Sequence, residues 1–151
     1  MIRVLAFADL DARTAYDVWR LRQDVFVVEQ ASVYPDLDGR DLEPTTRHLL
    51  LDQDDVLVGY LRLLDDGGSA RIGRVVVARD ARGRGLADEL MCAALAETGN
   101  RAVRLDAQTG LTRWYAGYGF EATGATFMDG GVSHVPMLRD AGGPDGFALR
   151  P

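Results

Sequence analysis

The residues best suited to chemistry form one segment, residues 75–87, in which an apolar run precedes a basic turn and a helical pattern. The first N–H groups of a helix have no partner within the helix, and with the helix dipole they form an anion site. Gly83 and Gly85 carry no Cβ, so a diphosphate can approach the backbone closely, and Arg82 and Arg84 add positive charge. The segment predicts a phosphate-binding turn, with a plain strand-to-helix turn as the alternative.

Two familiar phosphate-binding loops do not fit this segment. A Walker A loop ends in Gly-Lys-Ser/Thr, and all 17 basic residues of the chain are arginine. The dinucleotide fingerprint requires glycine or alanine at the position of Asp88.

Charge is distributed unevenly along the chain. Residues 71–84 contain five arginines and one acid, whereas residues 24–43 contain six acids and one arginine. Such runs indicate either two solvated surfaces or an anion site on the first segment and a cation site on the second.

Hydrophobic periodicity predicts the elements that position these residues. A helix should begin after Asp11, a suitable N-cap, and continue to Val28. The acidic stretch 30–46 should be a long loop, and loops of that length are often functional. Strands are expected at 2–7, 48–53, 56–64, 70–78 and 102–107, helices at 85–97 and 111–118, and a hairpin at 120–128 and 132–138. This order predicts an α/β fold with a mixed sheet.

Composition excludes several classes of protein. The chain has 151 residues, 47% of them hydrophobic and 26% charged, as expected for one globular domain. Cys92 is the only cysteine, which excludes an intrachain disulfide, and one cysteine with two histidines argues against structural zinc. No apolar run approaches the roughly 18 residues of a spanning helix, so we expect no membrane partner and a cytoplasmic location. The net charge of −6 argues against general nucleic-acid binding.

Several motifs together resemble one enzyme family. Arg82, Gly85 and Ala87 match the Arg/Gln-x-x-Gly-x-Gly/Ala motif of the GNAT superfamily of N-acetyltransferases, and residues 115–120 match its Tyr-x-x-x-Gly-Phe pattern. Residues 21–30, 34–41 and 46–49, and Asp129-Gly130 with His134, are similar to the ElaA-like branch. The resemblance predicts a GNAT-like domain over residues 1–140, with a mixed, mostly antiparallel central sheet and helices on both faces. A Gly/Pro-rich tail, residues 141–151, follows it.

The resemblance implies acetyl-CoA as the donor and assigns residues to its parts. The pantetheine arm would lie beside the strand of Val75, Val76 and Val77, and a backbone N–H near Val77 would face the thioester oxygen. The strand would carry a bulge, and the two halves of the sheet would splay at the cofactor. The pyrophosphate would be received by the turn and helix start, at Arg82, Gly83, Arg84, Gly85, Leu86 and Ala87.

The resemblance also implies that Tyr115 protonates the leaving thiolate. A thiolate leaves more readily when a nearby acid supplies a proton. The alternative is a core tyrosine packed beside Trp114 and Phe120, and Tyr118 is a competing phenol.

A primary amine must lose a proton before it attacks, so a general base is required. Glu29 is the first choice, because burial at the end of a hydrophobic helix would raise its pKa toward neutrality. An ion pair with an arginine such as Arg22 or Arg47 is the alternative. His134 is the second choice, as an imidazole in the hairpin, and His48 is expected to be structural.

The acidic loop should flank the acceptor. Asp36, Asp38 and Asp41 would favour a cationic amine through their field. A calcium loop does not fit, because the spaced ligands and terminal glutamate are absent.

The predicted function is transfer of acetyl from acetyl-CoA to a primary amine of a small molecule or peptide, by direct attack in a ternary complex. A non-catalytic CoA-binding sensor or partner module is one alternative. An acyltransferase similar to acylhomoserine-lactone synthases is the other, and a homodimer is compatible with the resemblance.

Overall fold

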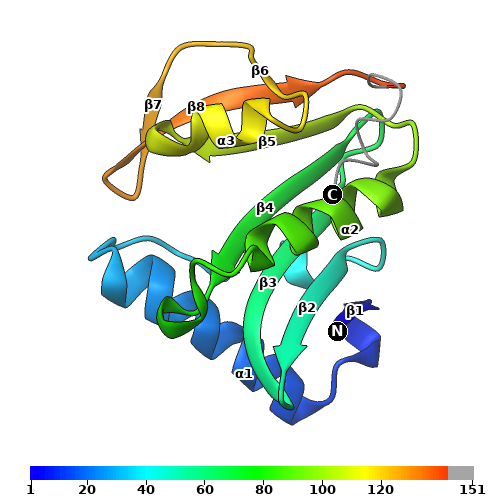
Figure 1. Cartoon of the computed structure of the whole chain (residues 1–151), viewed down its shortest axis with the longest axis vertical. Coiled ribbons are helices and arrows are strands. Elements are labelled where there is room, and N and C mark those ends of the chain that lie inside the picture. The colour runs from blue at the N-terminus through cyan, green and yellow to red at the C-terminus, as the bar shows by residue number, and fades with distance from the viewer. Residues whose placement is uncertain (143–151) are drawn as a thin grey trace.

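Within residues 1–142, the part of the chain that the computed structural model describes, eight strands form one mixed sheet (Figure 1). The strands are β1 (Ile2–Leu5), β2 (Arg47–Gln53), β3 (Val56–Asp65), β4 (Ala70–Val77), β5 (Val103–Gln108), β6 (Glu121–Ala122), β7 (Phe127–Asp129) and β8 (Val132–Arg139). The helices are α1 (Ala12–Arg22), α2 (Leu86–Thr98) and α3 (Thr112–Ala116). The predicted tail, with Phe147 and Leu149, lies outside the described residues except for residues 141 and 142, and the domain boundary at residue 140 stays a prediction.

The sheet opens into a V at its centre. Its order is β1-β2-β3-β4-β5-β8-β6, with β7 also paired to β8, and every pairing is antiparallel except that of β4 with β5. The parallel pair joins only Ala70 with Val103 and Arg71 with Arg104, after which the two strands diverge (Figure 1). The splay implied by the family resemblance is therefore confirmed.

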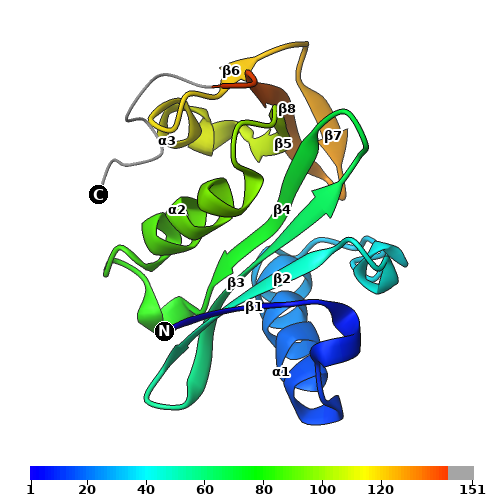
Figure 2. The ribbon, with the colours of Figure 1, turned by 90° about the vertical axis from the view of Figure 1, so that its right-hand side faces the viewer.

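Helices cover both faces of the sheet, as predicted. Figure 2 shows α2 and α3 on one face and α1 on the other. The larger apolar core lies under α2, whose Leu90, Met91 and Ala94 are fully buried. A smaller core lies under α1 and contains Val18 and Tyr60.

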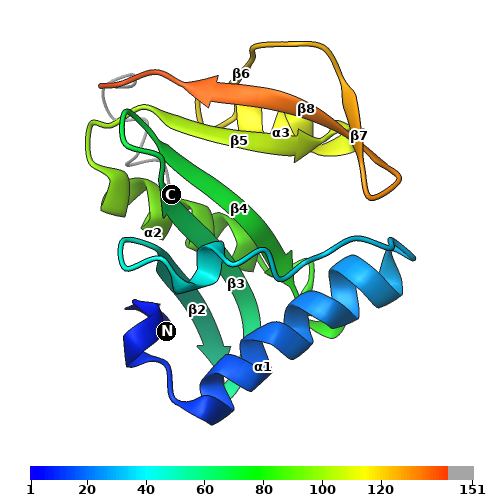
Figure 3. The same cartoon turned by 180° about the vertical axis from the view of Figure 1, so that it is seen from behind.

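The first predicted helix consists of two parts. The Asp11 carboxylate accepts a hydrogen bond from the Thr14 N–H at 2.7 Å, which confirms the N-cap. After Arg22 the helix widens into a π-helical segment, Gln23–Glu29. From its end the chain crosses the α1 face of the sheet toward β2 as a long loop (Figure 3), with one 3₁₀ turn at Arg40–Leu42.

The predicted hairpin is wrong in its first strand. Residues 120–128 form two short strands instead of one, because β6 pairs near the C-terminal end of β8 and β7 pairs near its start. Pro136 lies between these pairings and has no N–H to donate to a neighbouring strand, which accounts for the interruption.

A bulge lies in β4, where the sequence could not locate it. Tyr60 of β3 is opposite Val76, but Arg62 is opposite Gly73, so β4 contains one extra residue across from Leu61. Arg74, within the bulge, has a φ of +53°. As a result Val75 and Val77 pack against the core under α2, while Val76 packs against the core under α1.

Candidate active site

Two cavities meet at the V between β4 and β5. The loop-side cavity, about 310 Å³, lies toward the π-helical segment and the following loop. The helix-side cavity, about 400 Å³, lies toward α2 and α3. Both are lined by Val75, Val76, Val77, Arg82, Leu111 and Tyr115. A ligand in one cavity can therefore reach a ligand in the other at these residues.

Backbone groups dominate the turn at the helix-side cavity. Gly83 and Gly85 have φ of +79° and +75°, a left-handed conformation that glycine adopts without strain. Gly85 is the N-cap of α2, and no side chain among residues 1–142 caps that helix. The first N–H groups of α2 are thus available to an anion, and Leu86, Ala87 and Asp88 line the cavity.

The first turn of α2 holds two acids, Asp88 and Glu89, of which only Asp88 lines the cavity. Asp88 accepts a hydrogen bond from the Tyr118 hydroxyl. That contact also engages the competing phenol, and Tyr118 lines neither cavity.

Tyr115 lies where the two cavities meet. Its side chain is only 7% exposed and packs edge-to-face against Trp114 and Phe120, with centroid distances of 4.8 Å and 6.2 Å. Burial raises the pKa of Tyr115 to about 12, so the phenol keeps its proton at neutral pH. Tyr115 is therefore both a core residue and an available proton donor.

The edge of β4 presents main-chain groups to the gap. The Ala78 N–H donates to the Val58 carbonyl at 2.7 Å, so by alternation the N–H and C=O of Val77 point away from β3. The Nε of Arg82 donates to the Val77 carbonyl at 3.1 Å. An extended ligand along this edge would meet the N–H of Val77, which is directed to the gap, as an added strand does.

The surroundings of Glu29 differ from the buried environment that was expected to raise its pKa. Its two carboxylate oxygens accept from Arg82 at 2.7 Å and 2.9 Å, whereas Arg22 and Arg47 have other partners. The hydrogen bond from Arg82 lowers the pKa of Glu29. The predicted rise in pKa is wrong, because this side chain lies at the exposed end of the π-helical segment and is ion-paired.

His134 lines the loop-side cavity from β8. Its Nδ1 lies 2.8 Å from the Val132 carbonyl, which can only accept, so the hydrogen bond assigns the proton of the neutral ring to Nδ1. The ring stacks on Phe127 at 5.7 Å, and its Nε2 has no hydrogen-bond partner among the described residues. This tautomer leaves Nε2 as a proton acceptor.

The loop acids do not face the cavity as free carboxylates. Arg22 binds Asp36 and Asp41 at 2.9 Å and 2.7 Å, and Arg62 binds Asp38 at 2.8 Å. Arg74 adds an ion pair to Asp36 at 2.8 Å. None of the three aspartates lines either cavity. Three arginines compensate the charge of Asp36, Asp38 and Asp41, which argues against the prediction that these acids favour a cationic amine through their field.

This buried ion network, formed by Arg22, Arg62, Arg74, Asp36, Asp38 and Asp41, fastens the loop to the α1 face. Arg22 is fully buried, and His48 beside it contacts the Tyr60 hydroxyl at 2.6 Å and the Asp41 carbonyl at 3.0 Å. Burial lowers the pKa of His48. His48 is structural, as expected.

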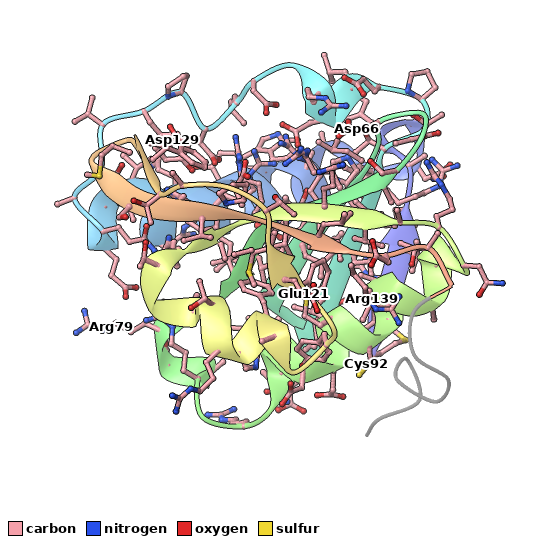
Figure 4. The ribbon with its side chains drawn as sticks, turned by 90° about the horizontal axis from the view of Figure 1, so that it is seen from above. Asp66, Arg79, Cys92, Glu121, Asp129 and Arg139 are labelled. Atoms are coloured by element: carbon pink, nitrogen blue, oxygen red, sulfur yellow. The ribbon has the colours of Figure 1, made fainter. Side chains whose placement is uncertain are left out.

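Several residues of the loop-side cavity were missed. Gln108 donates to Gln30 at 3.2 Å, and Ser32 donates to the Gly130 carbonyl at 2.5 Å, so two hydrogen bonds join the start of the long loop to β5 and to the turn before β8. Figure 4 shows Asp129 beside the loop, on the side of the molecule opposite Arg79. Arg71 and Arg74 also line this cavity. The basic run 71–84 signalled these arginines, but nothing in the sequence separates them from those of the turn.

Residues 1–142 contain no group of three or more His, Cys, Asp or Glu side chains that could hold a metal ion. No helix in the same residues is long and apolar enough to cross a membrane.

Comparison with known proteins gives consistent matches over nearly the whole chain. Residues 20–140 match the family model described as Acetyltransferase (GNAT) domain. The UPF0039 protein Rv2851c of Mycobacterium tuberculosis is 52% identical over 140 residues, covering 89% of this chain and 90% of that protein. Protein ElaA of Escherichia coli is 36% identical over 144 residues, covering 90% of this chain and 94% of that protein.

Solved structures agree. An acyl-CoA N-acyltransferase from Pseudomonas aeruginosa superposes with a TM-score of 0.88 at 38% identity, covering 92% of this chain and 98% of that one. Two structures of lower identity share the fold alone. The first is the CoA-dependent acyl-homoserine lactone synthase BjaI with SAM and isopentyl-CoA, with a TM-score of 0.77 at 20% identity, covering 99% of this chain and 86% of that one. The second is a GNAT family acetyltransferase from Elizabethkingia anophelis with acetyl-CoA bound, with a TM-score of 0.67 at 12% identity, covering 93% of this chain and 97% of that one.

Proposed function

The chain belongs to the GNAT acetyltransferase family, and on that premise we propose that it transfers acetyl from acetyl-CoA to a primary amine in a ternary complex. The observation that carries the proposal is the meeting of two cavities at Tyr115 and the edge of β4. One cavity holds the donor and the other the acceptor, so no covalent enzyme intermediate is needed.

The helix-side cavity fits the donor. Gly83 and Gly85 leave the backbone open, since a Cβ added at either position would meet nothing within 4 Å. The uncapped start of α2 offers N–H groups to the pyrophosphate. Arg82 lines this cavity and adds charge, whereas Arg84 does not line it and donates to Gln53 and the Asp80 carbonyl. Acetyl-CoA, when bound, supplies the activated thioester carbonyl.

Three groups of this chain act at the junction. Tyr115, whose buried phenol is protonated at neutral pH, donates a proton to the departing thiolate. The N–H of Val77 faces the gap and hydrogen-bonds the developing oxyanion. His134 accepts the amine proton at Nε2, directly or through water.

His134 replaces Glu29 as the preferred base. Glu29 is held by two hydrogen bonds from Arg82, and a carboxylate stabilised in this way is a weaker base. Glu29 instead occupies the guanidinium of Arg82 at the border of the two cavities and competes with the pyrophosphate for it.

The test is thiol release from acetyl-CoA across a panel of primary amines, followed by Tyr115→Phe and His134→Gln. Removing an acid or base costs about 10²-fold or more in kcat. Tyr115→Phe should leave the Kd for CoA unchanged, because the phenyl ring keeps its packing. Normal turnover in Tyr115→Phe would remove the acid role, and normal turnover in His134→Gln would remove the base role.

The two alternatives make different predictions. A CoA-binding module would bind CoA but release no thiol with any amine. An enzyme similar to acyl-homoserine lactone synthases, whose fold the chain shares, would prefer a longer acyl donor over acetyl-CoA. A series of acyl-CoA chain lengths separates both from the proposal.

A further inference from the structure

The two walls of the loop-side cavity carry different ionisable groups. Arg62, from β3, and Arg71 and Arg74, from β4, line one wall, and His134 and Asp129 line the other. The V between β4 and β5 separates the two walls. A ligand that spans the cavity thus meets guanidinium groups at one end and a base with a carboxylate at the other.

The arginines face the cavity while most of their partners lie behind them. Asp36, Asp38, Asp41 and Asp66 pair with Arg62, Arg71 or Arg74, and none of the four lines the cavity. Asp106 is the exception, since it lines the cavity and lies 3.4 Å from Arg71. Most N–H groups of these guanidiniums are directed to the acids, but Nη2 of Arg71 and Nη1 of Arg74 make no hydrogen bond within residues 1–142 and can serve a ligand.

Two buried donors of this wall, Nε of Arg62 and Nε of Arg74, make no well-aligned hydrogen bond within residues 1–142, and of the two only Nε of Arg74 has a carboxylate nearby, that of Asp36 at 2.8 Å. Arg62 is only 3% exposed, and its Nε has no hydrogen-bond partner within residues 1–142. A buried donor left without a partner costs free energy, and such a group is often completed by a ligand or a water molecule. Because Nε of Arg62 is also closed to solvent, it shows that the wall is short of acceptors and is not itself a ligand contact.

We propose that the acceptor is an amino acid, an amine that also carries a carboxylate, with the carboxylate bound by the arginine wall and the amine facing His134. The proposal rests on the proposed transferase function and specifies its substrate class. A planar carboxylate matches the geometry of guanidinium donors, and its single charge suits a wall already largely neutralised, whereas a dianion does not. Val25, Phe26 and Ile72 also line the cavity and would contact an apolar side chain.

This class is the reverse of the one that the acidic loop predicts. A polyamine or other simple cationic amine needs uncompensated carboxylates, and the loop carboxylates are consumed by Arg22, Arg62 and Arg74. The charged side chains that line the cavity on that side are Arg62, Arg71 and Arg74, and none of the loop carboxylates lines it.

The experiment compares matched acceptors with acetyl-CoA. L-alanine, L-leucine, L-phenylalanine and L-tryptophan are each assayed beside the corresponding decarboxylated amine and the uncharged amino-acid amide. We expect kcat/KM for the best amino acid to exceed that of its amine and amide by at least tenfold. Equal or faster reaction of the amines and amides would overturn the amino-acid proposal while leaving the transferase function intact.

Substitutions in the arginine wall test whether these residues produce the preference for the amino acid over its amine. Arg71→Gln and Arg74→Gln should each reduce the preference for the amino acid over its amine at least fivefold. Arg104→Gln is the matched control, because Arg104 pairs with Arg71 in register, is exposed and lines neither cavity. If Arg74→Gln fails to fold, Arg71→Gln, whose partners are surface acids, carries the test. An unchanged preference in Arg71→Gln would contradict the proposal.

A binding measurement separates failure of the proposal from failure of the function. If no amine in any series is acetylated, the transferase function fails, and calorimetry with the CoA-loaded protein then tests the wall directly. Tighter binding of an amino acid than of its amine, lost in Arg71→Gln, would support the proposal. Equal binding would overturn it, as would stronger binding of the matching aminophosphonate.

Discussion

The helix-side and loop-side cavities share six residues but are built in different ways. The first depends on backbone, namely two glycines with positive φ, the uncapped start of α2 and the edge of β4. The second depends on side chains that come from β3, β4, β5, β8 and the long loop. A backbone site requires a local sequence pattern, whereas a side-chain site requires that distant segments be brought together. Changes should therefore affect the two cavities separately.

The largest expected effect concerns the buried ion network behind the loop-side cavity. Arg22→Ala removes the partner of two buried carboxylates and should lower the free energy of unfolding by about 3–5 kcal/mol. Arg20→Ala, on the same helix, removes an exposed pair at 3.9 Å and should cost less than about 0.5 kcal/mol. Urea denaturation measures the free energy of unfolding of both variants. Similar decreases in the two variants would show that the network does not hold the loop.

Alanine at Gly85 should weaken the helix-side cavity alone. The φ of +75° costs about 1–2 kcal/mol for a residue with a Cβ, and that Cβ would enter the approach to the backbone. Gly67→Ala is the control, because Gly67 has a φ of +87° and equally open surroundings on an exposed turn. Calorimetry should show CoA binding at least tenfold weaker in Gly85→Ala and unchanged in Gly67→Ala. Equal affinities in the two variants would contradict the backbone site.

These comparisons show why the sequence predicts one cavity better than the other. The N-cap at Asp11 and the turn at Gly83 and Gly85 depend on neighbours within a few residues, so spacing identifies them. The Glu29–Arg82 pair joins residues 53 apart, and Arg62 meets Asp38 across 24. No local pattern specifies which arginine reaches which acid.

The same distinction applies within the fold. Strand and helix order followed from periodicity, but the bulge at Arg74 did not, because it depends on how β4 registers against β3. The bulge turns Arg74 toward the loop, where it pairs with Asp36. The acidic loop was thus identified as important, while its partners and its charge balance were not.

Acid should weaken the ion pairs that hold the loop. Burial raises the pKa of Asp38, but hydrogen bonds from Arg62 and the Arg40 N–H, with the charges of Arg62 and Arg74, outweigh burial and lower it to about 2. The stabilisation of the folded state by the Asp38 carboxylate is fully present above the unfolded-state pKa of about 3.9 and is lost as the pH falls toward 2. Urea midpoints between pH 6 and pH 2 should fall more steeply in the wild type than in Asp38→Asn. Parallel curves of urea midpoint against pH would show that Asp38 does not contribute to the pH dependence of stability.

The smallest effect tests the one ion pair that borders both cavities. Glu29→Gln releases Arg82 for an incoming pyrophosphate and should tighten CoA binding about two- to fivefold, the range expected of an exposed pair. Glu43→Gln is the control, since Glu43 binds Arg40 in a similar bidentate pair and lines neither cavity. Weaker CoA binding in Glu29→Gln would show that the pair supports the cofactor instead of competing with it.

The short contact between β4 and β5 has a mechanical consequence. Only two residue pairs join the strands, so the two half-sheets are held together mainly by the core under α2, which contains side chains from both halves. Across the cleft, the Arg71–Asp106 ion pair links β4 to β5, and the Gln30–Gln108 and Ser32–Gly130 hydrogen bonds link the long loop to the second half-sheet. Widening the cleft for a bulkier guest therefore requires breaking these polar links and shifting shared core side chains.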